Sequence, residues 1–231
     1  EEAVGKAVRE SGIPREEFFI TSKVWRSRLG YESTRKEFET SLKKLGTDYL
    51  DLYLIHWPRP EDLSAEWREL DVETWKAMEE LYRAGKVRAI GVSNFLPHHL
   101  NNLMERTGIV PVVNQLEFHP GYIQKAAVDF SQRLGIQVEA WSPIGRARVL
   151  KEPLLAELVD KYQVSVAQIC IRFALQCGVL PLPKSSSPER MRQNLDVFGF
   201  TIEDDDMHRL MTLPQIGWSG EHPDRERVPA E

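Results

Sequence analysis

Short apolar runs alternate with longer amphipathic runs along this chain, and each apolar run leads into a polar or aromatic side chain. Strand and helix patterns that alternate in this way are typical of βα units in a parallel sheet. The carboxyl ends of all strands of an α/β barrel surround one mouth, where active sites lie. The six predicted strands, each with the residues it leads into, are Phe18–Ile20 into Lys23, Leu52–Ile55 into His56, Ile90–Val92 into Ser93 and Asn94, Val112–Val113 into Asn114 and Gln115, Val138–Ala140 into Trp141 and Ser142, and Val179–Leu182 into Lys184.

The amphipathic runs carry capping residues at their starts and glycines at several of their ends, which are helix signals. The predicted helices cover residues 1–10, 33–45, 71–84, 97–106, 123–134 and 153–176. A closed barrel needs eight strands. The sequence therefore predicts an α/β fold, a (β/α)8 TIM barrel whose first two strands are absent from this chain. We expect one domain over residues 1–231, with an irregular tail at 214–231 that contains Trp218 and His222.

Composition narrows the possible partners. A net charge of −5 without basic clustering argues against nucleic acid or an anionic membrane surface. Cys170 and Cys177 are the only cysteines, and we interpret both as packed thiols in a reducing compartment. Because no apolar stretch is long enough for a membrane helix, we expect a cytoplasmic protein, a monomer or weak dimer, that acts on a small molecule.

Lys23 and His56 are the first candidate catalytic residues, since both follow strongly apolar strand patterns. A lysine at such a position can lower the pKa of a neighbouring acid such as a tyrosine, or form a Schiff base, and an imidazole can hydrogen-bond a substrate carbonyl. Trp25 and Trp57 lie close by in sequence. Their rings could form the walls of a substrate site for an apolar carbonyl compound, or serve only in ordinary packing.

Neutral polar side chains end the next strands. Ser93, Asn94 and Gln115 offer hydroxyl and amide groups suited to the carboxamide of nicotinamide, although Ser and Asn also favour turns between strands and helices. Trp141 could stack on the same nicotinamide ring or be a buried core residue.

The segment that follows the last strand predicts an anion site. Ser187 is placed to cap a helix whose first residue is Pro188, so free backbone N–H groups would face the loop where barrels often bind phosphate. Lys184 and Arg190 add two cations, which favours the extra phosphate of NADP over unphosphorylated NAD. The alternative is a solvated basic pair beside an ordinary cap.

Three other classes of enzyme are disfavoured because the sequence lacks their motifs. The sequence contains no glycine-rich dinucleotide fingerprint, no Cys/His spacing for zinc and no Gly-x-Ser-x-Gly elbow, so a Rossmann enzyme, a metal site and an α/β-hydrolase are all disfavoured.

Six motifs in order give the chain a family resemblance that runs from Glu1 nearly to the end. They are Phe19-Ile-Thr-Ser-Lys-Val-Trp25, Asp48-Tyr-Leu-Asp-Leu-Tyr-Leu-Ile-His-Trp-Pro58, Gly91-Val-Ser-Asn-Phe95, Asn114-Gln-Leu-Glu-Phe-His119, Trp141-Ser-Pro-Ile-Gly145, and Leu182-Pro-Lys-Ser185 with Arg190 and Asn194. The chain resembles the aldo-keto reductases, NADP-dependent (β/α)8 barrels that reduce aldehydes and ketones to alcohols by hydride transfer.

The resemblance implies a role for each matched residue. Lys23 and His56 would be two members of an Asp-Tyr-Lys-His catalytic tetrad, and Trp141 would take the stacking role that a tyrosine usually holds. The implied NADP(H) contacts are Ser93, Asn94 and Gln115 at the nicotinamide amide, Ser142 and Ile144 along the pyrophosphate, and Lys184, Ser185, Arg190 and Asn194 at the 2′-phosphate and adenine. The family places its catalytic Asp and Tyr upstream of a Glu-Glu-x-Val-Gly helix start, which here opens the printed sequence at Glu1. The printed chain alone is therefore expected to have little activity.

Two alternatives stay open at this point. A non-catalytic NADP-binding redox sensor or regulatory protein of the same fold would need the cofactor residues but not Lys23 and His56. A Schiff-base aldolase would use Lys23 as its nucleophile and would be trapped by borohydride in the presence of a carbonyl substrate.

Overall fold

The computed structural model describes residues 1–60 and 65–226 of the 231-residue chain. The last five positions of the predicted tail, 227–231, lie outside the described residues. The described chain forms two compact units. Unit 1 comprises residues 1–114 and 223–225, and unit 2 comprises residues 115–222 and 226. Each unit is described by itself.

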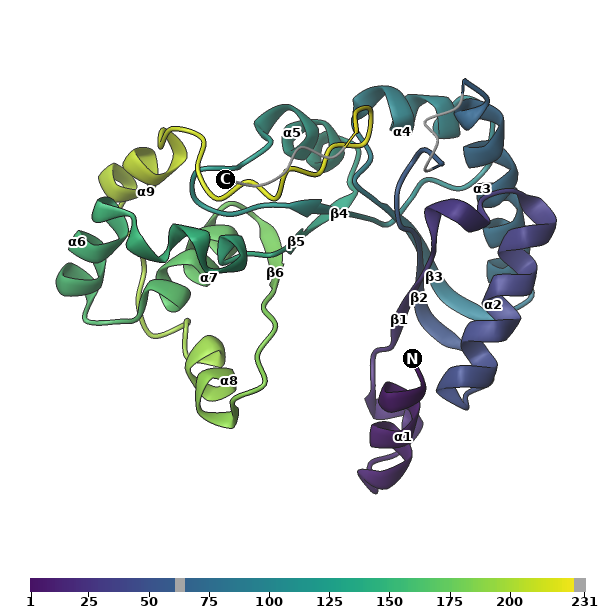
Figure 1. The fold of residues 1–231 in the computed structure, drawn as a ribbon, viewed down its shortest axis with the longest axis horizontal. Helices are drawn as coiled ribbons and strands as arrows, with labels where there is room; N and C mark the ends of the chain where they lie inside the picture. The colour runs from purple at the N-terminus through teal and green to yellow at the C-terminus, as the bar shows by residue number, and fades with distance from the viewer. Residues whose placement is uncertain (61–64, 227–231) are drawn as a thin grey trace. The chain divides into compact units, whose positions relative to one another are not determined.

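Unit 1 is built on parallel strands with helices between them. Its elements are α1 Glu2–Glu10, a short 3-10 turn at Arg15–Glu17, β1 Thr21–Val24, a second turn at Arg26–Arg28, α2 Tyr31–Leu45, β2 Leu50–Ile55, α3 Trp67–Arg83, β3 Val87–Ser93 and α4 Pro97–Met104. β2 pairs in parallel with β1 on one side and β3 on the other. α2 and α3 lie side by side along this part of the sheet (Figure 1).

Every residue of β2 is buried, which fits the continuous apolar run of a strand that is covered on both faces. Its one acidic residue, Asp51, is 1% exposed. The Asp51 carboxylate accepts hydrogen bonds from Arg15 Nη2, Arg88 Nη1 and the Ile20 amide, each at 2.9 Å. The buried charge is thus paired and hydrogen-bonded, as a charge in a core must be.

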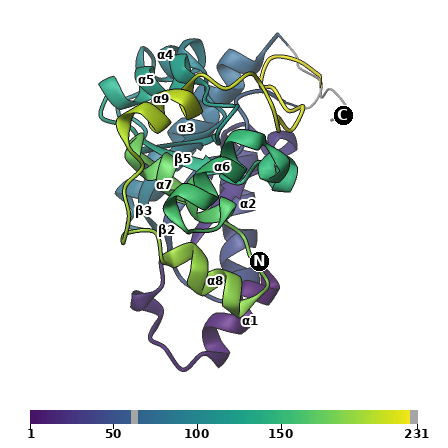
Figure 2. The ribbon, with the colours of Figure 1, turned by 90° about the vertical axis from the view of Figure 1, so that its left-hand side faces the viewer.

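β4, Val113–Glu117, carries the chain from unit 1 into unit 2. The elements that follow are α5 Lys125–Arg133, β5 Gln137–Trp141, a 3-10 segment at Gly145–Lys151, α6 Pro153–Tyr162, α7 Val166–Gln176, β6 Val179–Leu182, α8 Pro188–Leu195 and α9 Asp204–Met211. β5 and β6 pair in parallel, with Trp141 opposite Leu182. α6 packs beside α7 (Figure 2), and α8 follows β6 (Figure 1).

The predicted fold class is confirmed. The described residues hold six strands, and their order in the sheet is the order of the chain, from β1 to β6. A helical segment lies between each strand and the next, which is the βα alternation of a barrel with two strands fewer than eight.

Four predicted strand ends are wrong. The first strand is Thr21–Val24 rather than 18–20, so Lys23 lies within the strand instead of after it. Three other strands likewise include residues that were predicted to follow them: Ser93 in β3, Asn114 and Gln115 in β4, and Trp141 in β5. In each case the polar or aromatic residue at the carboxyl end continues the strand, because strand hydrogen bonds do not depend on apolar side chains.

The helix boundaries also differ from the predicted ones. α2 begins at Tyr31 after Gly30, and α3 begins at Trp67, so Asp71 is a buried helix residue instead of a cap. The predicted helix at 153–176 is two helices, because Gln163 adopts a left-handed conformation and Ser165 caps a new start. α9 was not predicted, although the three aspartates in its first turn favour a helix start.

The structure also describes most of the tail and both cysteines. Residues 214–226 form neither helix nor extended strand pairing, and Cys170 and Cys177 are free thiols. None of the helices in the described residues is long and apolar enough to cross a membrane.

Candidate active site

Two neighbouring parallel strands of unit 1, β1 and β2, position Lys23 and His56. Lys23 is half-buried in β1, and His56 follows β2, where its amide donates a hydrogen bond of 3.1 Å to the Val24 carbonyl. Burial, and then the positive charges of Lys23 and Arg26, lowers the pKa of His56 to about 4. At neutral pH His56 is therefore an uncharged imidazole beside a lysine, able to hydrogen-bond a carbonyl oxygen without bringing a full charge.

The two tryptophans beside His56 differ in exposure. The Trp25 ring stands edge-on to the His56 ring with centroids 4.6 Å apart, and 46% of Trp25 is exposed. Trp57 is only 8% exposed, with the Arg26 guanidinium 5.1 Å from its ring centroid. Trp25 therefore presents a ring surface to solvent while Trp57 supports Arg26. The substrate-binding role of both rings stays a prediction.

Arg26 was missed by the sequence reasoning, although it affects both His56 and Trp57. Its only sequence signal is a cation directly after the first strand motif.

Ser93 and Asn94 come together at the end of β3. Asn94 has a positive φ of 64°, a conformation that Asn tolerates better than most residues. In this position its amide nitrogen donates to the His56 carbonyl at 3.0 Å and to the Ser93 hydroxyl oxygen at 3.1 Å. Asn94 thus ties the end of β3 to the residue that follows β2, which fixes the backbone of His56.

Gln115 is buried in unit 2 and donates from its amide nitrogen to Glu139 Oε2 of β5 at 2.8 Å. This bond fixes the orientation of the Gln115 amide. Trp141 ends β5 and is partly exposed, and the Arg146 guanidinium lies 5.4 Å from its ring centroid. The predicted contacts of Gln115 and Trp141 with the nicotinamide stay predictions.

A cavity of about 630 Å³ lies within unit 2, inside the range of about 300 to 1,000 Å³ that small-molecule sites occupy. It brings together six of the residues predicted to bind the cofactor, from segments far apart in sequence. They are Ser142, Ile144, Lys184, Ser185, Arg190 and Asn194. Trp141 precedes Ser142 in the chain and is not part of the lining.

The chemistry of this cavity suits a phosphorylated ligand. As predicted, Ser187 caps α8, with its hydroxyl oxygen accepting from the Arg190 amide at 3.3 Å, and Pro188 is the first helical residue. Pro188 has no N–H group and the Arg190 amide is bonded by the cap, so the Glu189 amide is the one N–H of this first turn left without a partner within the helix, and the helix start favours an anion. Lys184 and Arg190 are both exposed and contribute two positive charges to the lining.

The start of α7 also lines the cavity, through Ser165, Val166 and Ala167. Ser165 and Gln168 cap each other's backbone amides at 3.3 Å and 3.0 Å. The sequence reasoning missed this second helix start, although Ser165-x-x-Gln168 is a capping-box pattern that could have revealed it. Arg146 lines the cavity as well and was also missed.

The structure thus divides the candidate site residues into two groups. Unit 1 holds Lys23, Trp25, His56, Trp57, Ser93 and Asn94 at the carboxyl ends of β1, β2 and β3. Unit 2 holds the cavity, with Gln115 and Trp141 on strands that precede it in the chain.

Comparisons with known proteins agree with each other. The sequence model of the aldo/keto reductase family matches residues 1–213. The chain is 46% identical to the glyoxal reductase of Bacillus subtilis, over 97% of this chain and 78% of the relative. It is 41% identical to the methylglyoxal reductase DkgA of Salmonella typhimurium, over 97% of this chain and 80% of the relative. Among solved structures, a mutant of Gox0644 in complex with NADPH matches with a TM-score of 0.88 and 40% identity, over 98% of this chain and 80% of that one.

Proposed function

The chain belongs to the aldo/keto reductase family, and from that premise we propose that it serves an NADPH-dependent reduction of aldehydes or ketones to alcohols. The observation that carries the proposal is the cavity of unit 2, which gathers Lys184, Arg190 and the start of α8 around one volume. That combination suits the extra phosphate of NADPH. The 2-oxoaldehydes named in the relatives' activities, glyoxal and methylglyoxal, are the first substrates to test.

The cofactor NADP(H) would be held by residues of both groups. Lys184, Ser185, Arg190 and Asn194 would hold the adenosine 2′-phosphate and the adenine, and Ser142 and Ile144 would lie along the pyrophosphate. Ser93, Asn94 and Gln115 would bind the nicotinamide amide, with Trp141 stacked on the ring. When bound, NADPH supplies the hydride.

The residues of unit 1 have distinct parts in this scheme. His56, neutral at pH 7 because of its lowered pKa, would hydrogen-bond the substrate carbonyl and orient it. Lys23 would stabilise the anion left when a tyrosine gives its proton to the carbonyl oxygen, which lowers the pKa of that tyrosine. The exposed ring of Trp25 would contact the apolar part of the substrate.

The decisive assay is substrate-dependent oxidation of NADPH by the natural full-length protein. Glyoxal, methylglyoxal and an aromatic aldehyde are each offered with NADPH or NADH. We expect oxidation of NADPH with at least one aldehyde, and markedly slower oxidation of NADH at equal concentration. If the protein binds NADPH but none of the carbonyl compounds causes NADPH to be oxidised, the proposal is contradicted and a redox sensor is favoured. Trapping by borohydride would instead favour an aldolase.

A further inference from the structure

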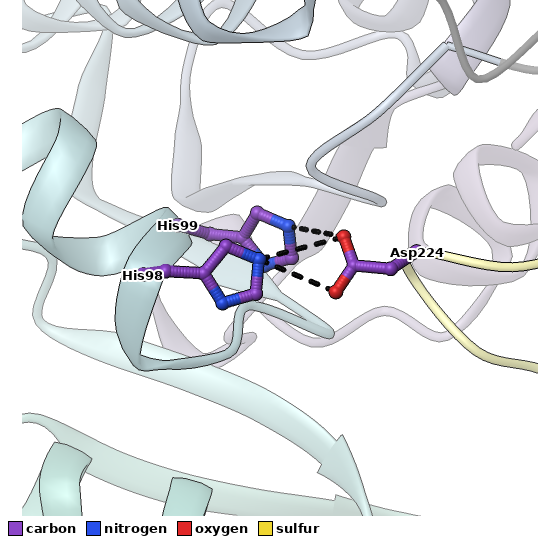
Figure 3. Close-up of side chains that lie close together, drawn as sticks. All are labelled: His98, His99 and Asp224. Atoms are coloured by element: carbon purple, nitrogen blue, oxygen red, sulfur yellow. Dashed lines mark hydrogen bonds and ion pairs between the residues drawn. The ribbon is translucent and has the colours of Figure 1, made fainter.

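A cluster of charged and aromatic side chains in unit 1 holds the C-terminal tail. Asp224, in the segment 223–225, faces two adjacent histidines in the first turn of α4, as Figure 3 shows. Asp224 Oδ1 lies 3.0 Å from His99 Nε2, and Oδ2 lies 3.2 Å from His98 Nε2. Arg59, in the loop after β2, donates from Nη1 to the same Oδ1 at 3.2 Å. Two elements of unit 1, α4 and the loop after β2, therefore converge on one carboxylate of the tail.

His99 is the fixed member of this cluster. Its side chain is fully buried, with ring centroids 4.9 Å from Trp67 and 5.7 Å from Phe95. The Leu96 amide donates to His99 Nδ1 at 3.0 Å, so the neutral ring carries its proton on Nε2 and donates it to Asp224. Burial, and then the neighbouring His98, lowers the pKa of His99 to about 3. The ring thus stays neutral at physiological pH and acts as an oriented hydrogen-bond donor.

The cluster also has the composition of a metal site, since the ligand atoms of His98, His99 and Asp224 all lie within 4.8 Å of one another. Two observations argue against a metal. An ion on His99 Nε2 would move the ring proton to Nδ1, where it would meet the Leu96 N–H. The guanidinium of Arg59 also occupies Asp224 Oδ1, and its positive charge opposes a cation at the same oxygen. The contacts are those of hydrogen-bond donors from Arg59, His98 and His99 around one acceptor, the Asp224 carboxylate.

The position of Arg59 connects this carboxylate to the candidate active site. Arg59 follows Trp57 and His56 by two and three residues in the loop after β2. α4 follows Ser93 and Asn94, and Asn94 is bonded to the His56 carbonyl. The Asp224 contacts are therefore made to the two segments that carry the proposed carbonyl-binding and nicotinamide-binding residues of unit 1.

We propose that Asp224 is a positioning residue for substrate binding: it anchors the C-terminal tail to Arg59, His98 and His99, and so fixes the loop after β2 beside His56 and Trp57. The anchoring follows from the contacts alone, whereas its effect on substrate binding rests on the proposed function. Charge-assisted hydrogen bonds are about twice as strong as neutral ones, so Asp224 dominates this anchor. Loss of the carboxylate is expected to release the segment 223–225 without disturbing the cavity of unit 2, because residues 215–222 of the tail keep their own contacts, such as the bonds from Ser219 to Glu117 at 3.0 Å and 2.6 Å.

The test compares Asp224→Asn with Asp224→Glu and with the control Glu226→Gln in the full-length protein. Glu226 is an exposed carboxylate two residues further along the same tail, so its loss changes the tail charge equally. We expect amide hydrogen exchange in residues 224–226 to accelerate roughly tenfold or more in Asp224→Asn, because a charged acceptor is replaced by a neutral one. The Ser219 amide, which donates to Glu117 Oε1 at 3.0 Å, should exchange at an unchanged rate. Asp224→Glu should restore part of the protection, and Glu226→Gln should leave it unchanged.

The kinetic measurement tests positioning separately. In Asp224→Asn we expect KM for the best aldehyde to rise several-fold while kcat and the Kd of NADPH stay within about twofold. Unchanged exchange in the tail, or faster exchange with an unchanged KM, would overturn the proposal. Protection that increases on adding Zn²⁺ to the wild type, but not to His98→Ala, would overturn it in favour of a metal site. Failure of the proposed function is distinguishable, because it would show as no aldehyde turnover by the wild type, while hydrogen exchange still reports on the anchor.

Discussion

Replacing Lys23 with methionine in the full-length protein is expected to lower kcat for aldehyde reduction by roughly 10² to 10⁴, the range that a positioned acid–base partner contributes. Lys23 is half-buried in β1, and its charge contributes to the lowered pKa of His56. Methionine keeps the length and apolar body of the side chain but removes the ammonium group. The proton donor would then lose the positive charge that makes its pKa suitable.

Three further measurements distinguish a loss of catalysis from a loss of cofactor binding or of surface charge. The Kd of NADPH should stay within about twofold, because we place Lys23 at the reacting carbonyl and not at the phosphates. The pKa of His56, followed by NMR, should rise above about 4 when the neighbouring charge is removed. The control is Lys36→Met, which removes an exposed lysine of α2 and should leave kcat unchanged. Undiminished turnover in Lys23→Met would exclude Lys23 from the catalytic group.

Arg190→Ala should weaken NADPH binding by roughly ten- to a hundredfold and leave NADH binding nearly unchanged. Arg190 lines the cavity of unit 2 at the capped start of α8. A hydrogen bond to a charged group contributes about 1.5 to 3 kcal/mol, which corresponds to that change in Kd. The reason for selectivity is that only NADPH carries the additional phosphate.

The matched control for Arg190 is Arg192→Ala. Arg192 lies on the same helix and is also exposed, but it is not among the residues that line the cavity. Its loss removes the same charge from the same helix, so a general electrostatic effect would weaken NADPH binding equally in both variants. Calorimetric titration of both variants with NADPH and NADH separates the two explanations. If Arg190→Ala lowers the affinity for NADPH and for NADH equally, Arg190 does not bind the additional phosphate of NADPH.

The fold class and the capped start of α8 were predictable from the sequence because their signals are local. Ser187, Pro188 and Arg190 stand within four positions, and their spacing indicates a capped helix start that the structure confirms. The buried run of β2 was equally clear, since every one of its residues is buried. Such signals need no knowledge of which segments meet in space.

Other parts of the site depend on contacts between distant segments and were not predictable. Asp224 is 125 residues away from His99 in sequence, and nothing in the tail composition indicates that its carboxylate meets that ring. Ser165 brings a second helix start to the cavity, and its capping box has no meaning for function until the fold places it there. The ends of β1 and β4 were misplaced because polar residues continue their backbone pairing. Boundaries of this kind are decided by tertiary pairing more than by hydrophobic pattern.

The central claim is that this protein transfers a hydride from NADPH to a carbonyl carbon, and isotope transfer tests it most directly. The full-length protein is incubated with an aldehyde and with NADPH deuterated at the hydride-donating carbon of the nicotinamide, on one face in one sample and on the other face in a second. We expect the alcohol formed in one sample, and only in that one, to carry one deuterium on its carbinol carbon by mass spectrometry. Tight NADPH binding with no deuterated alcohol in either sample would contradict the account.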